Sequence, residues 1–534
     1  MTASRVAFVL LLAVEAPLLA LAVARRGRLA RAARVALFLL PIVLAISLRG
    51  YQAFGTRDVL DWDETYYLSL AVTGASGHGL YPYIYGFGPM RVMGGIGYAA
   101  YVDAAAVLLA GPTVLALRAV SLAGAAAGLL CLWLLVRKWY GSGTAWMAAA
   151  LTATLHLFVI ANSARMDSLA FGWVAAALLV VATAFERRDQ LRWHALAGLV
   201  FGLGLEVHID TSVTAAACGL AYLVAWLRDV KARGRCHPPT EMLVYMAGLA
   251  VGIALYAGAN ILPDPDAFYR TAALARVDAT AWYSRGTSSV LGSFLDPRIV
   301  FAREWTRYGI LLHVVHPLEI ALGAAAFAAL IVRRNASDRL VIPIAAGVVL
   351  AAAVVLTTAS PLYSSHTLPA LAVPLAPLFT HGLRRSGKVA LDELRLPSTL
   401  ACVVVLCALF AVNNVRAARS VYERTGPPQA DLAFAARVRA VVDPRCIVAG
   451  DGSLYVRHFA GYPFYVSTRR TEVEYAMLFY GVSTEEAYWA IKKPDAVLSR
   501  VPPGRALAGY LSREGLTARE PGIWIRAAGC RGGP

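Results

Sequence analysis

The chain has 534 residues, of which 58% are hydrophobic and 16% are charged, and its formal net charge is +17 at pH 7. Soluble domains average about 45–50% apolar and about 25% charged residues, so this composition excludes an ordinary soluble protein and predicts a polytopic membrane protein. The positive charge does not indicate nucleic-acid binding, because the Lys and Arg residues fall in short loops between apolar runs.

Twelve apolar runs are candidate membrane spans, each of which needs about 20 residues. They are 5–24, 34–50, 112–136, 143–161, 168–185, 194–208, 209–226, 241–262, 309–332, 340–358, 367–383 and 397–414. No clear small-residue cleavage site follows the first run, so we interpret it as a retained helix and not as a signal peptide.

Clusters of Lys and Arg place the loops relative to the membrane. They lie at 25–34, 137–138, 187–192, 228–235, 333–339 and 384–388. With twelve crossings, all of these loops fall on one side, which the positive-inside rule makes cytoplasmic. The N-terminus and the C-terminal region then lie on the outer face. Residues 94–110 are apolar but short and contain Asp103, so we expect a re-entrant or interfacial helix on the outer face.

The first outer loop, 51–111, contains the sequence DWDETYY, in which Asp61, Asp63 and Glu64 follow an apolar span. A single carboxylate in such a place is usually only solvated. Three within four residues repel and raise one another's pKa values, and such a group is typical of a site that binds a cation or moves a proton. A carboxylate kept ionised there is a candidate general base.

Other outer segments carry weaker patterns. Asp167 begins a span and is either a helix N-cap or, with Arg165, part of a charge pair that binds phosphate. The sequence EVHID, 206–210, is either a metal site that includes His208 or a hydrogen-bonded turn. Tyr363 and His366 share a short turn. The long loop 263–308 combines arginines, among them Arg270, with aromatic residues that are either interface anchors or phosphate ligands.

The C-terminal residues change character, and we predict two domains, 1–414 in the membrane and 415–534 outside it. Short apolar runs at 446–450, 462–466, 495–499 and 523–527 predict strands, and 484–493 predicts a short helix. This alternation favours a small α/β domain. Cys446 and Cys530 bracket the region and are a candidate disulfide if it faces an oxidising compartment. The other cysteines form no metal pattern.

The motifs resemble those of the GT-C glycosyltransferases, in particular the bacterial branch related to dolichyl-phosphate-mannose–protein mannosyltransferases and lipid A aminoarabinose transferases. They follow one another along almost the whole chain, and no single one is specific. The residues that carry the resemblance are Asp63, Glu64 and Tyr67, then GLYPYIYGFGPM (79–90), LRAVSLAGAAAGLL (117–130), ARMDSLA (164–170) and SSHTLPALAVPLAPL (364–378).

This resemblance implies a GT-C-like fold of about 12 spans and an enzyme that moves a sugar from a polyprenyl-phosphate carrier to a hydroxyl of a glycan, lipid or protein on the extracytoplasmic face of a bacterial plasma membrane. Asp63 would be the base, Glu64 would place or polarise the acceptor, and Asp167 would line the same pocket. The implied ligands of the donor phosphate are Arg91, Arg165, Arg270, Tyr363 and His366, and the implied pocket residues are Asp61, Tyr67, Tyr81 and His208.

Three features depart from the family pattern: Arg91 stands where related sequences often have a lysine, His366 stands where a tyrosine is common, and the span 5–24 is additional to the usual first helix. No cofactor is required by this reading, although a divalent metal is compatible with it. A transporter or lipid flippase is the main alternative, because it also places charged residues in spans. A receptor or scaffold is a third reading, and it leaves the DWDE cluster without a role. The sequence names neither the sugar nor the acceptor.

Overall fold

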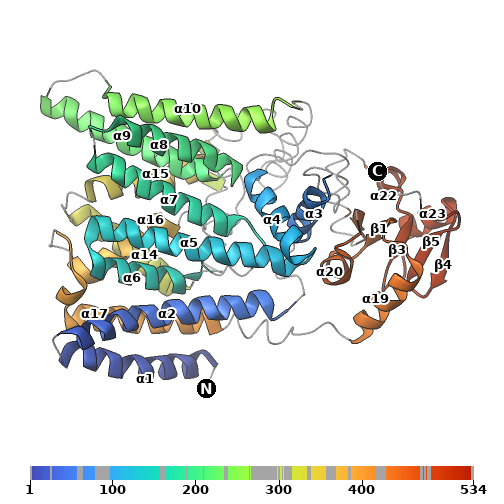
Figure 1. Ribbon diagram of the computed structural model, residues 1–534, viewed down its shortest axis with the longest axis horizontal. Coiled ribbons are helices and arrows are strands. Elements are labelled where there is room, and N and C mark those ends of the chain that lie inside the picture. Colours follow the sequence, from blue (N-terminus) through green and yellow to red (C-terminus); the bar gives the residue numbers. More distant parts are fainter. Residues whose placement is uncertain are drawn as a thin grey trace.

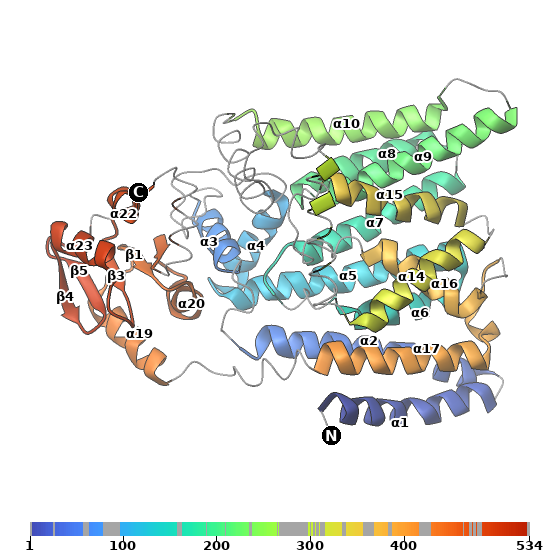
Figure 2. The same cartoon turned by 180° about the vertical axis from the view of Figure 1, so that it is seen from behind.

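The structure is a computed structural model (Figures 1 and 2). It describes residues 3–24, 27–56, 64–77, 97–156, 158, 163–187, 189–208, 210–233, 238–263, 265, 297–298, 301–302, 305, 309, 316–333, 338–355, 368–382, 387–415, 429–462, 464–468, 473, 477 and 483–530.

Long helices lie side by side in one bundle (Figures 1 and 2). Seven helices of the described residues are long and apolar enough to cross a membrane. They are α1 (Ala3–Ala24), α2 (Arg28–Phe54), α5 (Val114–Tyr140), α7 (Asp167–Glu186), α9 (Thr211–Arg233), α10 (Thr240–Asn260) and α17 (Leu396–Leu409), which continues as the π-helix η5 (Phe410–Val415). The chain is therefore a multi-pass helical membrane protein, as its composition predicts.

Shorter helices occupy the other predicted spans. They are α6 (Ser142–Thr154), α8 (Leu191–Leu203), α14 (Pro317–Val332), α15 (Asp338–Val355) and α16 (Leu368–His381). A helix of 14 residues, such as α16, is about 21 Å long, which is less than the roughly 30 Å of a hydrocarbon core. Every predicted span thus contains a helix, but the number of twelve crossings stays a prediction.

Two short helices lie at one end of the bundle, between it and the C-terminal strands (Figures 1 and 2). They are α3 (Glu64–Ala75) and α4 (Gly97–Ala110), and they pack against each other. We call this end of the bundle the C-terminal face. The predicted segment 94–110 thus contains the helix α4, and its re-entrant or interfacial placement stays a prediction.

Close packing of α5 on α7 brings the predicted motifs of both helices together. A Cβ added at Gly128 would lie 2.4 Å from the Phe171 ring, and one added at Gly172 would lie 2.9 Å from the carbonyl oxygen of Gly124. Small residues let helix backbones approach in this way in membranes. α5 begins after Thr113, whose hydroxyl accepts from the Ala116 N–H group, and ends at Gly141 with φ 91°.

The C-terminal residues fold into a five-stranded mixed sheet of order β2-β1-β3-β5-β4. Its strands are β1 (Ile447–Gly450), β2 (Phe464–Ser467), β3 (Ala496–Leu498), β4 (Leu516–Glu520) and β5 (Ile523–Arg526). β1 pairs in parallel with β2 and β3, and β5 pairs antiparallel with β3 and β4. The helices of this region include α19 (Gln429–Val441), η6 (Tyr455–Phe459), α22 (Glu485–Lys492) and α23 (Arg505–Arg513). The predicted strands at 446–450, 462–466, 495–499 and 523–527 and the predicted helix at 484–493 are confirmed.

Buried apolar residues form two clusters. One fills the helix bundle. The other is continuous from α3, α4 and the start of α5 into the C-terminal sheet, so the two parts share one core. Tyr455 of η6 joins them further, because its hydroxyl hydrogen-bonds to Ser69 of α3; burial raises the pKa of this hydroxyl and the hydrogen bond lowers it by less. The C-terminal region, residues 429–530, is thereby fixed to the helices of the C-terminal face.

Candidate active site

Glu64, the first residue of α3, is completely buried. Arg118 of α5 binds it with two parallel hydrogen bonds, from Nε to Oε1 at 2.8 Å and from Nη2 to Oε2 at 2.6 Å. Oε1 also accepts from the backbone N–H of Ala164 at 2.8 Å. This bidentate arrangement is the strongest form of a charge pair between these two side chains. We call Glu64 and Arg118 together the clamp.

Arg118 is buried as completely as its partner and uses its third nitrogen to bind the chain that leads into the acidic loop. Nη1 donates to the carbonyl oxygen of Ala53 at 3.0 Å and to that of Thr56 at 2.6 Å. A buried ion pair repays its desolvation only when its remaining hydrogen-bonding groups are also satisfied. The clamp meets this requirement, and it ties together α2, α3, α5 and the segment before α7.

Arg165 and Asp167 form a second buried pair beside the clamp, with Arg165 Nε 2.8 Å from Asp167 Oδ2. Both side chains are almost completely buried, at 2% and 0% exposure. Ser121, one helical turn after Arg118, donates from its hydroxyl to the Arg165 carbonyl oxygen at 2.9 Å. Since Ala164 is bound to Glu64, the structure brings three predicted site residues, Glu64, Arg165 and Asp167, around one short segment.

Tyr67 lies one turn into α3 and is 9% exposed, with its ring 5.4 Å from that of Tyr66 in an edge-to-face arrangement. It lies on the same short helix as Glu64, and its role as a pocket residue stays a prediction.

The sequence EVHID folds as a turn between α8 and α9. Glu206 accepts a hydrogen bond from Asn260 of α10, and the Asp210 N–H donates to His208 Nδ1 at 3.2 Å. His208 Nδ1 also lies 3.5 Å from Asp210 Oδ2. Among the residues that the structure describes, no group of three or more His, Cys, Asp or Glu is arranged to hold a metal ion. The hydrogen-bonded turn is therefore the alternative that the geometry favours for this sequence.

Several predicted site residues lie outside the described ranges. They are Asp61, Asp63, Tyr81, Arg91, Arg270, Tyr363 and His366. Their roles remain predictions. Cys446 and Cys530 are described, and they form a disulfide with a Cα–Cα distance of 5.0 Å.

Residues 98–259 match the family model described as dolichyl-phosphate-mannose-protein mannosyltransferase. The match includes Arg118, Arg165 and Asp167. It confirms the resemblance to the GT-C membrane glycosyltransferases. No curated protein sequence matches the chain.

Two solved structures of ArnT share the fold of this chain over nearly its whole length. ArnT from Cupriavidus metallidurans bound to undecaprenyl phosphate is 12% identical with a TM-score of 0.56, covering 93% of this chain and 99% of that one. ArnT in the apo state is 12% identical with a TM-score of 0.53, covering 91% and 97%. The Archaeoglobus fulgidus oligosaccharyltransferase is 13% identical with a TM-score of 0.49, covering 87% and 69%.

Reasoning from the sequence did not assign a role to Arg118 or Ser121 in this GT-C-like site. Arg118 did carry a usable signal, because a cation within an apolar span requires a counter-charge or carbonyl oxygens. The chain offers few acidic residues within reach of the same face, and Glu64 is one of them.

Proposed function

We propose that the protein transfers a sugar from a polyprenyl-phosphate carrier to a hydroxyl group of a glycan, lipid or protein. Two findings support this proposal: the family match at 98–259 and a fold shared with ArnT, one structure of which contains undecaprenyl phosphate. Both are consistent with a GT-C glycosyltransferase, and the DWDE cluster supplies the carboxylate that such a reaction needs.

The observation that carries the mechanism is the clamp. Asp63 directly precedes Glu64 in the sequence, and three charge-assisted hydrogen bonds fix Glu64. A general base must be held within hydrogen-bond reach of the proton that it removes. Both Glu64 oxygens already have partners, so we assign Glu64 to positioning and Asp63 to proton removal.

In the proposed reaction, Asp63 accepts the proton of the acceptor hydroxyl as its oxygen attacks the anomeric carbon of the donor. The bond from that carbon to the phosphate oxygen breaks, and polyprenyl phosphate leaves with the electron pair. The phosphate is a good leaving group, so the protein needs cations around it and no strong acid. Arg91, Arg165, Arg270, Tyr363 and His366 are the proposed ligands of the donor phosphate.

We place the reaction on the extracytoplasmic side. Arg187 directly follows α7, and Arg228 and Lys231 lie in the last turns of α9; both helices end at the end of the bundle opposite the C-terminal face, as the positive-inside rule requires of cytoplasmic ends. The Cys446–Cys530 disulfide on the C-terminal face also favours an oxidising compartment there. The division into a membrane domain, residues 1–414, and an extracytoplasmic domain, residues 415–534, is part of this proposal.

The test is release of free polyprenyl phosphate from a panel of polyprenyl-phosphate sugars, in the presence of a membrane glycolipid or peptide extract. Loss of a general base costs roughly 10²–10⁴-fold in rate, so Asp63→Asn is expected to release product at least a hundred times more slowly than the wild type. Asp189→Asn is the matched control, because it removes an exposed carboxylate from a loop that we place on the cytoplasmic side.

Equal release by the wild type and Asp63→Asn would show that the DWDE cluster is not the base. The protein could instead bind the lipid and move it across a bilayer without releasing polyprenyl phosphate from any donor. That result would support a transporter.

A further inference from the structure

A second carboxylate binds the segment that joins α6 to α7, at the end opposite to the one that the clamp binds. Glu319 lies in the first turn of α14, and its Oε1 and Oε2 accept from the backbone N–H of His156 at 3.0 and 3.2 Å. His156 comes just after α6, and Ala164, whose N–H donates to Glu64, comes just before α7. Two carboxylates from distant parts of the chain thus hold the two ends of this segment.

Asn413 of the π-helix η5 supports the same end of the segment as Glu319. Its Nδ2 donates to Glu319 Oε1 and, at 2.9 Å, to the carbonyl oxygen of Thr154, the last residue of α6. A side-chain amide has two N–H groups, so one asparagine can serve both acceptors. Asn413 is only 6% exposed, so water competes little for these hydrogen bonds. Asn413 thus fixes Glu319 relative to the end of α6.

The next residue of η5 binds the helix that leads into the acidic loop. Arg49 of α2 is completely buried and donates from Nη2 to Asn414 Oδ1 at 2.7 Å and from Nη1 to Gln52 Oε1 at 2.8 Å. Further along α2, the carbonyl oxygen of Ala53 accepts from Arg118 of the clamp. π-helical turns are rare and are frequently found at functional sites. Here one such turn connects α2, α6 and α14 through two consecutive asparagines.

The segment fixed in this way leads into the second buried pair of the candidate site. Arg165 and Asp167 follow Ala164 closely, and in the proposed function they bind the donor phosphate and line its pocket. The residues of a site need surrounding groups that hold them close to the productive geometry. The clamp supplies this support at one end of the segment, and Glu319 and Asn413 supply it at the other.

We propose that Glu319 and Asn413 are positioning residues for sugar transfer, and that they act through the segment between α6 and α7. By holding the start of this segment, they keep Arg165 and Asp167 in place at the donor. This inference rests on the proposed function. Neither Glu319 nor Asn413 touches the substrate, because both act through hydrogen bonds to backbone groups and to each other.

The first test compares Glu319→Gln with Glu319→Leu in the release of free polyprenyl phosphate, expressed per folded molecule. Gln keeps a side-chain oxygen that accepts from the His156 N–H, whereas Leu accepts no hydrogen bond. At saturating donor, Glu319→Leu is expected to be about tenfold to a hundredfold slower, since a displacement of about 1 Å can cost roughly 10²-fold in rate. Glu319→Gln should release product at nearly the wild-type rate. A merely structural role would lower the amount of folded protein and leave the rate per folded molecule unchanged.

The second test follows the segment itself and needs no sugar donor. Hydrogen–deuterium exchange is measured in overlapping peptides that resolve residues 163–168, which do not include the N–H group bound by Glu319. Exchange there is expected to be faster in Glu319→Leu and in Asn413→Leu than in the wild type, because each change removes hydrogen bonds that hold the start of the segment. Glu319→Gln should exchange like the wild type.

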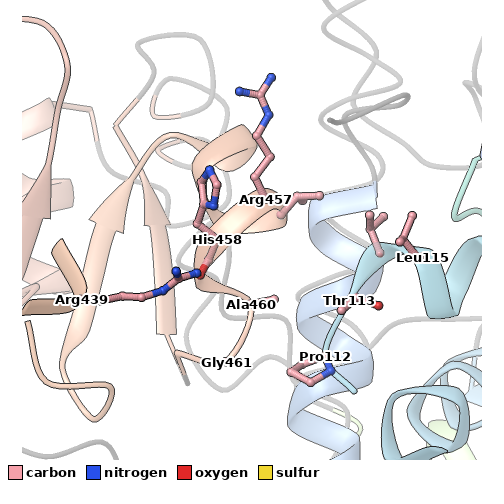
Figure 3. Close-up of a pocket in the computed structure, with 10 residues that line it drawn as sticks. Pro112, Thr113, Leu115, Arg439, Arg457, His458, Ala460 and Gly461 are labelled. Atoms are coloured by element: carbon pink, nitrogen blue, oxygen red, sulfur yellow. The ribbon is translucent and has the colours of Figure 1, made fainter. Parts of the chain in front are cut away.

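Two controls separate this role from a general loosening of the protein. Glu241 also lies in the first turn of a membrane helix, α10, and is partly exposed, so Glu241→Leu is the matched variant and should change neither rate nor exchange. The C-terminal region contacts the bundle at a different place, where Pro112 and Leu115 of the bundle and His458 of η6 line one pocket (Figure 3). Exchange of η6 should therefore be the same in all variants and the wild type.

Three outcomes would contradict the proposal, and they are distinguishable. Wild-type rates in folded Glu319→Leu and Asn413→Leu, with Asp63→Asn inactive, would overturn the positioning role and leave the proposed function intact. Slower release without faster exchange at 163–168 would also overturn it, because the two side chains would then not act through the segment. No release by the wild type from any donor would overturn the proposed function, and the positioning role in transfer with it.

Discussion

Three groups of arginine–carboxylate ion pairs in this protein differ in how far their side chains are exposed to solvent, and therefore in how much they contribute to stability. In the clamp, both side chains have 0% exposure. In the C-terminal region, Asp431 is 3% exposed, but its partners Arg457 and Arg500 are 11% and 39% exposed. Asp443 and Arg445 pair at 2.7 Å with 39% and 81% exposure. From the first pair to the last, water competes more strongly for the charged groups. The distance between two charged groups therefore does not by itself indicate how much the pair contributes to stability.

The largest effect is expected at the clamp. Arg118→Met leaves Glu64 buried without its counter-charge, which costs about 3–5 kcal/mol of folding free energy. Apparent melting temperature in detergent and the yield of folded protein measure the loss. The double variant Glu64→Leu/Arg118→Met removes both charges and is expected to be more stable than the single variant. If the double variant loses as much stability as the two single variants lose together, the two charges are not coupled.

A smaller effect is expected at Asp431. Asp431→Asn removes the shared partner of Arg457 and Arg500 and is expected to cost about 1–3 kcal/mol, the range for a charge-assisted hydrogen bond. The apparent melting temperature in detergent measures the loss. Asp392→Asn, at an exposed pair with Arg34, is the control. Equal melting temperatures of the two variants would contradict the ranking by burial.

Lys492 extends the comparison to a partly buried cation on the C-terminal side. Burial lowers the pKa of Lys492 from 10.5 to about 6. Between these pH values the unfolded chain binds a proton that the folded protein does not, so stability rises with pH across this window. Lys492→Met should raise the melting temperature at pH 7 and flatten its dependence between pH 6 and 10. Lys493→Met, at an exposed neighbour, should leave the slope unchanged.

No change in melting temperature is expected at the exposed end of the series. Arg445 lowers the pKa of Asp443 to about 2, chiefly through its side-chain hydrogen bond. Both groups are nevertheless open to solvent, where ion pairs contribute little. Asp443→Asn should have the same melting temperature as the wild type at pH 7. A decrease in melting temperature as large as that of Asp431→Asn would contradict the ranking of ion pairs by exposure.

The sequence predicts the bundle better than the site. Spans are recognised because a continuous apolar run is a local property, and all the predicted ones contain helices. The strand β4 was not predicted, since LTARE is mostly polar and exposed at the edge of the sheet. The helix α23 was missed as well, because RALAGYLSR has a single apolar face and is short.

The clamp could not be predicted from local patterns. Glu64 and Arg118 are 54 residues apart, and Glu64 and Ala164 are 100 apart. Periodicity indicates which face of a helix is buried, but it does not specify which turn of a distant helix a carboxylate meets. The disulfide was within reach of the sequence, because only Cys446 and Cys530 lie in the C-terminal region.

The backbone bond from Ala164 to Glu64 has a consequence for biogenesis. The Glu64 carboxylate is bound by Arg118 of α5 and by the Ala164 N–H of the segment that leads into α7, and these groups leave the ribosome one after the other. Before residue 164 has been synthesised, a nascent chain holds Glu64 with one acceptor position unfilled. The clamp therefore acquires its full set of hydrogen bonds only after roughly the first third of the chain has been synthesised.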